Sequence, residues 1–182
     1  MKKAVWLNKS NGQLCVTIPK DSGIKAGDIV NVEKEKIKTI VYTPVTADLF
    51  HYGHLKILEA ANNLGDFHIC GVVTDKGIRT YKKGAITNLK ERMAIVSALR
   101  CVDMVVTQDG KSAMGNLKKI HSQFKGAKLI LVHGSNWKKI PAAEYVKKIN
   151  GEVVRLPFYE KLSTKKMIGK ILNLYKDGVD GG

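Results

Sequence analysis

The chain reads Thr39-Ile-Val-Tyr-Thr-Pro-Val-Thr-Ala-Asp-Leu-Phe-His-Tyr-Gly-His54 where a strand-like run gives way to two histidines around a glycine. The apolar residues at its start predict a buried strand, and the residues after it predict a helix. Parallel-sheet proteins place their chemistry where a strand ends and a helix begins. The unpaired N–H groups of a helix start also favour phosphate. Two imidazoles at this point therefore indicate hydrogen-bond donors for a charged phosphoryl group.

Strand and helix patterns alternate from this stretch to the end of the chain. Asn88 with Glu91 forms a capping-box pattern for one helix, and Ser163 can cap the last one. The expected strands are 39–44, 67–74, 102–107, 129–132 and 153–156, and further helices are expected at 53–64, 113–124 and from Pro141 to near Gly151. Five strands alternating with helices predict an α/β fold, a Rossmann-like doubly wound parallel sheet over 39–176.

The first 38 residues follow a different pattern. Short strands are expected at 4–7, 14–18 and 29–33, with a turn at Asn11-Gly12. These elements predict a small all-β segment over 1–38 that precedes the α/β domain. Residues 177–182 are expected to form a flexible tail.

The composition favours anionic partners. Lysine and arginine number 31 against 16 aspartate and glutamate residues, for a net charge of +15. This charge indicates a nucleotide, a phosphorylated substrate or nucleic acid as partner, although a solvated basic surface explains many individual lysines. Cys15, Cys70 and Cys101 lie too far apart for a disulfide framework or a zinc site, so we interpret them as small core residues. No apolar stretch approaches the ~20 residues of a membrane span, no signal core follows Met1, and we expect a cytoplasmic protein.

Polar side chains gather at the expected strand ends. The first strand leads to Thr46, Asp48, His51 and His54, and later strands or helix starts add polar groups at 74–75, 79–83, 133–137 and 163–164. Histidines, lysines, hydroxyls and a helix start suit a polyphosphate better than an acyl group. The chain has no GxSxG elbow. It also has no Gly-x4-Gly-Lys-Ser/Thr loop, which argues against an ordinary kinase or GTPase.

Three motifs in order resemble the HxGH nucleotidyltransferase superfamily: Asp48-Leu-Phe-His-Tyr-Gly-His54, Glu91-Arg92 and Leu162-Ser-Thr164. Within that superfamily, residues 39–172 are most similar to cytidylyltransferases acting on glycerol 3-phosphate, choline phosphate and ethanolamine phosphate. They also resemble the cytidylyltransferase domains of phosphonate pathways, through Val73-Thr-Asp75 with Tyr81-Lys82 and Val132-His-Gly134 with Trp137.

The resemblance implies transfer of a nucleotidyl group from a nucleoside triphosphate to a phosphate or phosphonate oxygen, with pyrophosphate leaving. It places His51, His54 and Lys82 at the reacting phosphates, with Lys83 as a near substitute for Lys82. The implied nucleotide-binding residues are Thr46, Asp48, Arg92, Gly134, Ser163 and Thr164, and the expected acceptor-binding residues are Asn136, Trp137, Phe158 and Tyr159. Mg2+ is expected as the cofactor, carried by phosphate oxygens and water rather than by a protein metal site.

Several residues have a structural interpretation or depart from the family pattern. Arg92 could pair with a helix acid, and Trp137 could pack in the core. We interpret His68 and His121 as structural, while His133 stays open. The family's glycine and aromatic residue are replaced by Val45 and Ala47, two frequent aspartates by Ser135-Asn136, and an R-T-E-G run by 158–161. These departures leave the acceptor contacts open.

The N-terminal segment resembles the swapped-hairpin fold of AbrB-like and MazE-like proteins. The resemblance rests on Asn11-Gly-Gln, Val16-Thr-Ile-Pro-Lys20 and Gly23-Ile-Lys-Ala-Gly-Asp-Ile-Val30. It implies an intertwined dimer that often binds DNA. We favour dimerisation alone, and so expect a homodimer with DNA as a less favoured partner.

We therefore expect a CTP-dependent cytidylyltransferase that acts on a small phosphomonoester or phosphonate. Two alternatives stay open. One is an adenylyltransferase that uses ATP, of the FAD synthetase or pantetheine-phosphate type. The other is a DNA-binding regulator with a nucleotide-sensing domain, supported by the N-terminal segment and the basic composition.

Overall fold

The computed structural model describes residues 5–7, 14–16, 22–29 and 36–176. The chain divides into two compact units, Met1–Glu35 and Lys36–Gly182. In the first unit, β1 (Val5–Leu7) pairs antiparallel with β2 (Leu14–Val16). The expected turn at Asn11-Gly12 and the expected tail at 177–182 lie outside the described residues, as does most of the strand expected at 29–33.

The second unit contains a five-stranded parallel sheet with the order β5-β4-β3-β6-β7. Its strands are β3 (Thr39–Val45), β4 (Phe67–Val73), β5 (Met104–Gln108), β6 (Lys128–Gly134) and β7 (Glu152–Leu156). The chain winds outward from β3 to β5 and then crosses to β6 on the other side of β3. The predicted doubly wound α/β fold is thereby confirmed, and its crevice opens where β3 and β6 end.

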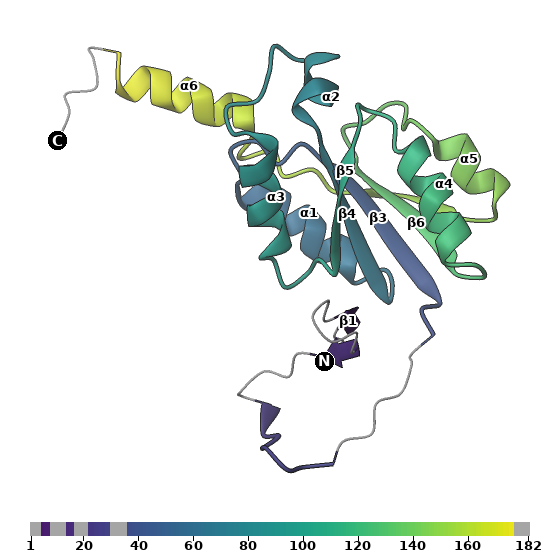
Figure 1. Cartoon of the computed structure of the whole chain (residues 1–182). Coiled ribbons are helices and arrows are strands. Elements are labelled where there is room, and N and C mark those ends of the chain that lie inside the picture. The colour runs from purple at the N-terminus through teal and green to yellow at the C-terminus, as the bar shows by residue number, and fades with distance from the viewer. Residues whose placement is uncertain (1–4, 8–13, 17–21, 30–35, 177–182) are drawn as a thin grey trace. The chain divides into compact units, whose positions relative to one another are not determined.

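Helices cover both faces of this sheet (Figure 1). One face carries α1 (Tyr52–Asn62) and α3 (Leu89–Ser97), whose Leu58 and Val96 pack on the sheet residues Cys70 and Val72. The other face carries α4 (Met114–Gln123) and α5 (Ala143–Lys148), which pack against Ile40, Tyr42 and Leu131. The last helix is α6 (Thr164–Leu174), which begins after the Ser163 cap expected from the sequence. No helix among the described residues is long and apolar enough to cross a membrane.

Two local features differ from the sequence expectations. Residues Asp75–Arg79 form a short helix, α2, that the sequence analysis does not predict, and the Thr74 hydroxyl caps it by accepting a hydrogen bond from the Gly77 N–H. A five-residue helix is too short to show a helical period in the sequence. Helix α5 begins at Ala143 instead of at Pro141, because Ala142 has a positive φ of 68° that a right-handed helix cannot include.

Candidate active site

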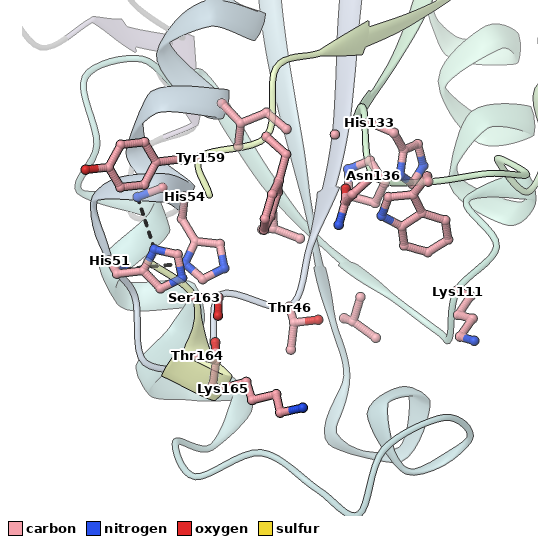
Figure 2. A pocket seen from close by; sticks show the side chains of 18 of the residues that line it. Thr46, His51, His54, Lys111, His133, Asn136, Tyr159, Ser163, Thr164 and Lys165 are labelled. Atoms are coloured by element: carbon pink, nitrogen blue, oxygen red, sulfur yellow. Dashed lines mark hydrogen bonds between the residues drawn. The ribbon is translucent and has the colours of Figure 1, made fainter. Parts of the chain in front are cut away.

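A pocket of about 610 Å³ opens at the carboxyl ends of the parallel strands, a size suited to a small-molecule ligand. Most of the residues predicted for the site line it, namely Thr46, His51, His54, Lys82, Gly134, Asn136, Trp137, Phe158, Tyr159, Ser163 and Thr164. Figure 2 shows the two sides of this pocket, with His51, His54, Ser163 and Thr164 on one side and His133 and Asn136 on the other. Thr46, at the end of β3, lies between them.

The two motif histidines cap the helix that carries them. The Nδ1 atom of His51 accepts a hydrogen bond from the Gly53 N–H at 3.0 Å, and the Nδ1 atom of His54 accepts one from the His51 N–H at 3.4 Å. This reciprocal capping box fixes the start of α1. Because each Nδ1 accepts, each neutral ring carries its proton on Nε2. Both rings line the pocket and can donate an Nε2–H there.

Gly53 is required for this arrangement. A Cβ atom at this position would lie 2.9 Å from Cε1 and 3.0 Å from Nδ1 of His51, and 3.4 Å from the Cβ of Tyr159. The first two distances are shorter than carbon and nitrogen atoms tolerate. The glycine of the motif therefore allows the His51 ring to fold back over the helix start.

Burial keeps both imidazoles neutral. Burial, together with the nearby His51 and Lys82, lowers the pKa of His54 to about 4. Burial also lowers the pKa of His51 below its ordinary value. The rings are stacked with their centroids 4.0 Å apart, a spacing that two imidazolium cations would oppose. Near neutral pH the pair therefore offers two neutral donors.

The start of α6 faces the same side of the pocket. The Ser163 hydroxyl accepts a hydrogen bond from the Lys166 N–H at 3.2 Å and caps the helix. The Thr164 hydroxyl donates to the Asp48 carbonyl at 3.1 Å, which ties α6 to the loop after β3. Ser163, Thr164 and Lys165 all line the pocket. A helix start with an adjacent lysine is a favourable place for phosphate oxygens.

Asp48 does not line the pocket but holds two of its loops together. Its carboxylate accepts hydrogen bonds at 3.0 Å from the N–H groups of Ile86 and Thr87, and one at 2.9 Å from the Thr87 hydroxyl. Burial alone would raise its pKa, but these bonds and the nearby Arg92 keep the pKa of Asp48 below its ordinary value. Asp48, expected as a nucleotide-binding residue, therefore lies outside the pocket lining and orients the loop that follows β3.

Arg92 takes a different place from the one expected in a nucleotide site. Its side chain is fully buried and lies outside the pocket lining. The guanidinium donates to the carbonyls of Thr46 at 2.6 Å, Val73 at 2.7 Å and Thr87 at 3.1 Å, and it pairs with Asp75 at 2.5 Å. All of these partners belong to the loops and strand ends around the site. Four of the five N–H donors of Arg92 are therefore used to hold the loops and strand ends around the site.

Lys82 lines the pocket beside an aromatic ring. Its Nζ lies 5.9 Å from the centroid of Tyr81, and the Nζ of Lys111 lies 5.0 Å from the same centroid. The Tyr81 hydroxyl is 3.2 Å from the Thr46 Oγ1 atom. Tyr81 thus joins the loop after α2 to the end of β3. Two lysine ammonium groups lie near its ring.

The residues after β6 form the other side of the pocket. A Cβ atom at Gly134 would lie 2.7 Å from Oδ1 of Asn136, so the glycine leaves room for that amide. Trp137 packs against the core cluster and against the His133 ring, with centroids 4.7 Å apart, while also lining the pocket. Trp137 therefore both packs on the core and forms part of the pocket wall. Tyr159 makes an edge contact with Tyr52, with centroids 5.3 Å apart.

The other histidines separate clearly. His68 is buried, with Nδ1 at 2.6 Å from the Cys101 carbonyl and Nε2 at 3.0 Å from the Thr43 hydroxyl, so it is structural. His133 is buried and lines the pocket, and its Nε2 has no hydrogen-bond partner among the described residues. Burial, with Arg155 nearby, lowers the pKa of His133 to about 4.

Sequence reasoning missed several residues that line the pocket: Gln108, Lys111, Lys138, Pro157 and Lys165. Gln108 and Pro157 directly follow expected strands and Lys165 lies in the first turn of an expected helix, so their positions could have identified them, whereas Lys111 and Lys138 lie in loops away from the expected strand ends. Their residue types alone could not, because the chain has many lysines. The described residues contain no group of three or more His, Cys, Asp or Glu side chains able to hold a metal ion.

Comparison with known proteins agrees with this geometry. Residues 42–170 match the family model described as Cytidylyltransferase-like. The chain is 30% identical over 155 residues to the Bifunctional protein HldE of Syntrophotalea carbinolica, covering 83% of this chain and 30% of that protein. It is 31% identical over 165 residues to the HldE protein of Trichlorobacter lovleyi, covering 86% of this chain and 32% of that protein. The chain thus spans about a third of the length of these curated relatives.

A solved structure shows the same fold. The lipopolysaccharide core biosynthesis protein of Thermoplasma volcanium superposes with a TM-score of 0.54 at 27% identity, covering 67% of this chain and 98% of that one. The family model covers most of the parallel-sheet unit, including the histidine pair and the start of α6. On this evidence, the chain belongs to the cytidylyltransferase-like family of nucleotidyltransferases.

Proposed function

We propose that this protein transfers CMP from CTP to a small phosphomonoester or phosphonate and releases pyrophosphate. The observation that carries the proposal is the convergence of two Nε2–H donors with the start of α6 in one pocket. The family description supports cytidine as the nucleoside. A nucleoside triphosphate and a phosphorylated acceptor are the partners that the family implies in general.

The proposed reaction is an in-line displacement at phosphorus. An oxygen of the acceptor phosphate or phosphonate attacks the α-phosphorus and forms a new P–O bond. The bond from the α-phosphorus to the bridging oxygen breaks, and pyrophosphate leaves with the electron pair. No protein nucleophile is needed, so catalysis consists of positioning and of stabilising the developing negative charge.

The residues divide this work between them. The neutral rings of His51 and His54 donate hydrogen bonds to phosphate oxygens at the reacting centre. The start of α6, with Ser163 and Lys165, receives the leaving pyrophosphate. Lys82 supplies a cation to the pocket from beside Tyr81. Donors that are already held in place lose little free energy to reorganisation when charge develops.

Mg2+ is proposed to enter with the triphosphate. The described residues that line the pocket include no carboxylate, so this lining offers no protein-based Mg2+ site. The ion would be held by phosphate oxygens and water, as is common for Mg2+ with nucleotides. It would supply further charge neutralisation to the triphosphate.

The central test is pyrophosphate release. Purified protein with Mg2+, CTP and a panel of small phosphomonoesters and phosphonates should release pyrophosphate with at least one acceptor and form a CMP-linked product. His51→Ala should abolish release without unfolding the protein. His121→Ala is the matched control, because His121 is an exposed histidine on α4. The absence of pyrophosphate with every acceptor would refute the proposal.

The choice of nucleotide is tested separately. Thermal unfolding with CTP and with ATP at equal concentrations reports which one binds more tightly, because the better ligand raises the midpoint more. CTP is expected to give the larger shift. A larger shift with ATP would replace the cytidylyltransferase proposal with an adenylyltransferase.

A further inference from the structure

The charge on the pocket lining is one-sided. Four lysines line the pocket, Lys82, Lys111, Lys138 and Lys165, and no aspartate or glutamate is among the described lining residues. None of the four lysines forms a salt bridge to a carboxylate within the described part of the chain. Lys165 lies at the start of α6 on the histidine side (Figure 2), and Lys82 lies beside Tyr81. The proposed function assigns no phosphate group to Lys111 or Lys138.

Lys111 is carried by a loop that is tightly fixed. Gly110, just before it, has a φ of +83°. Its backbone N would lie 2.3 Å from a Cβ at Gly77, so the start of α2 packs directly on this loop. The Gly110 carbonyl accepts a hydrogen bond from the Gln108 amide at 2.9 Å, and the Gln108 Oε1 accepts one from the Tyr42 hydroxyl at 2.8 Å. The loop that presents Lys111 is therefore anchored to the sheet core.

Lys138 is also carried by a supported turn. Arg155 of β7 donates to the carbonyls of Trp137 and Lys138, each at 3.3 Å. Trp137 is in turn packed on the core cluster. The backbone that presents Lys138 is thus held by a strand and by the core at once.

The two lysine loops lie on the same face of the sheet. Ala113, two residues after Lys111, and Ile140, two residues after Lys138, belong to one buried cluster under α4 and α5. Met114 and Lys138 also line one common smaller pocket. This side of the site is opposite the histidines and the start of α6 (Figure 2).

Among the described lining residues, this side has no carboxylate that could pair with an ammonium. Asn136 supplies a neutral amide here, and the neighbouring Ser135 hydroxyl accepts a hydrogen bond from the Phe158 N–H at 3.1 Å. The Tyr81 ring is near two lysine ammonium groups. An ammonium on the acceptor would find no opposite charge here, while a carboxylate would have lysine side chains in the lining to pair with.

We infer that the acceptor carries a second anionic group, a carboxylate, in addition to its phosphate or phosphonate, and that Lys111 and Lys138 bind it. This inference rests on the proposed function for the identity of the reaction. It narrows the acceptor to small carboxylated phosphonates or phosphomonoesters. It excludes amino-alkyl acceptors as the preferred class.

The test compares three acceptors of equal length: carboxymethylphosphonate, hydroxyethylphosphonate and aminoethylphosphonate. With wild-type protein, CTP and Mg2+, kcat/KM is expected to be highest for the carboxylate and lowest for the ammonium, with at least a tenfold span. Calorimetric titration of each probe into the protein with CTP should give the same order of affinity without relying on turnover.

Variants locate the effect. Lys111→Met and Lys138→Met should each raise KM for the carboxylate acceptor about tenfold while the KM for CTP and the hydroxyl acceptor's kcat/KM change little. Lys118→Met is the matched control, since Lys118 is exposed on α4 outside the pocket. Asn136→Asp should move the preference toward the amino acceptor by introducing a carboxylate beside it.

The outcomes separate this inference from the proposed function. Preference for the amino acceptor, in turnover or in calorimetry, overturns the inference and leaves nucleotidyl transfer intact. An equal loss for all three acceptors in the lysine variants, or a raised KM for CTP, also overturns it. If no acceptor turns over, the proposed function fails, and the calorimetric order still decides the charge preference.

Discussion

His51 and His54 each use their two ring nitrogens for different purposes. The Nδ1 atoms accept hydrogen bonds from backbone N–H groups at the start of α1, and this leaves the Nε2–H groups for the pocket. The tautomer of each ring is thus fixed by its own helix, without a carboxylate partner. A donor that is held in this way has a fixed direction before any ligand arrives.

Replacing His54 by asparagine separates its two roles. The Oδ1 atom of Asn can accept the bond from the His51 N–H in place of Nδ1, but the variant has no Nε2–H. We expect kcat to fall about 100- to 1,000-fold, the cost of losing one fixed donor, with the thermal midpoint nearly unchanged. Steady-state kinetics and thermal unfolding measure the two effects. His121→Asn is the control, and kcat within tenfold of wild type would contradict the role assigned to His54.

Gly53→Ala tests the space under the His51 ring. The new Cβ would lie 2.9 Å from Cε1 of His51, so the ring must move away from its present position. We expect a loss of activity of at least tenfold with the protein still folded. Gly115→Ala in α4 is the control, because nothing lies within 4 Å of its added Cβ and alanine favours a helix by about 0.5–1 kcal/mol. Equal activity in the two variants would show that His51 tolerates displacement.

At the scale of elements, Arg92 connects the strand ends and loops that shape the pocket. Its donors reach the end of β4, the loop after β3, the residue before the Asn88 cap and the start of α2. Four separate segments therefore depend on one planar side chain. Lysine cannot replace this set of contacts, because an ammonium lacks the forked geometry of a guanidinium.

Arg92→Lys should therefore destabilise the fold. Leaving buried carbonyls and a buried charge poorly paired costs about 3–5 kcal/mol. Urea unfolding should show this as a lower midpoint, and activity should fall because the loop after β3 loses its support. Arg100→Lys, at an exposed position, is the matched control. A midpoint that stays within the error of the control would contradict the positioning role.

The elements differ in how far the sequence predicts them. The apolar runs predict all five parallel strands to within two residues, and the pattern is strongest in β3, β4 and β6, which are mostly buried. Helix α2 and the start of α5 depend on a hydroxyl cap and on one positive φ, which leave no periodic pattern. The histidine pair is predictable from its place at a strand end. The placement of Lys111 depends on the close approach of Gly77 to Gly110, a contact between segments far apart in the sequence.

For the whole molecule, the buried histidines make folding sensitive to pH. Burial, with nearby cationic side chains, lowers the pKa of His54 and of His133 from 6.5 to about 4. The unfolded chain therefore binds more protons than the folded chain between these values. The stability from neutral histidines is complete above pH 6.5 and is lost as the pH falls toward 4.

The free energy of unfolding should consequently decrease between pH 7 and pH 4, by roughly 3 kcal/mol for each of the two histidines. Urea unfolding at several pH values measures this slope. His133→Gln should flatten it, because glutamine does not titrate, while the exposed His121→Gln should leave it unchanged. A slope that is the same in wild type and His133→Gln would contradict the pKa shift of His133.

For the N-terminal unit, homodimer formation and DNA binding stay predictions.

The capping box of α1 has a consequence for how this motif changes over evolutionary time. Because the imidazoles complete the start of their own helix, natural selection for a folded chain acts on them even where selection for the reaction has ceased. A descendant without the activity would still lose helix stability on replacing either histidine by a residue that cannot accept the capping hydrogen bond. Among the other lysines and hydroxyls in the described pocket lining, only Ser163 caps a helix. Substitutions at Lys82, Lys111 and Lys138 should therefore indicate a changed or lost activity in a relative sooner than substitutions at the histidines.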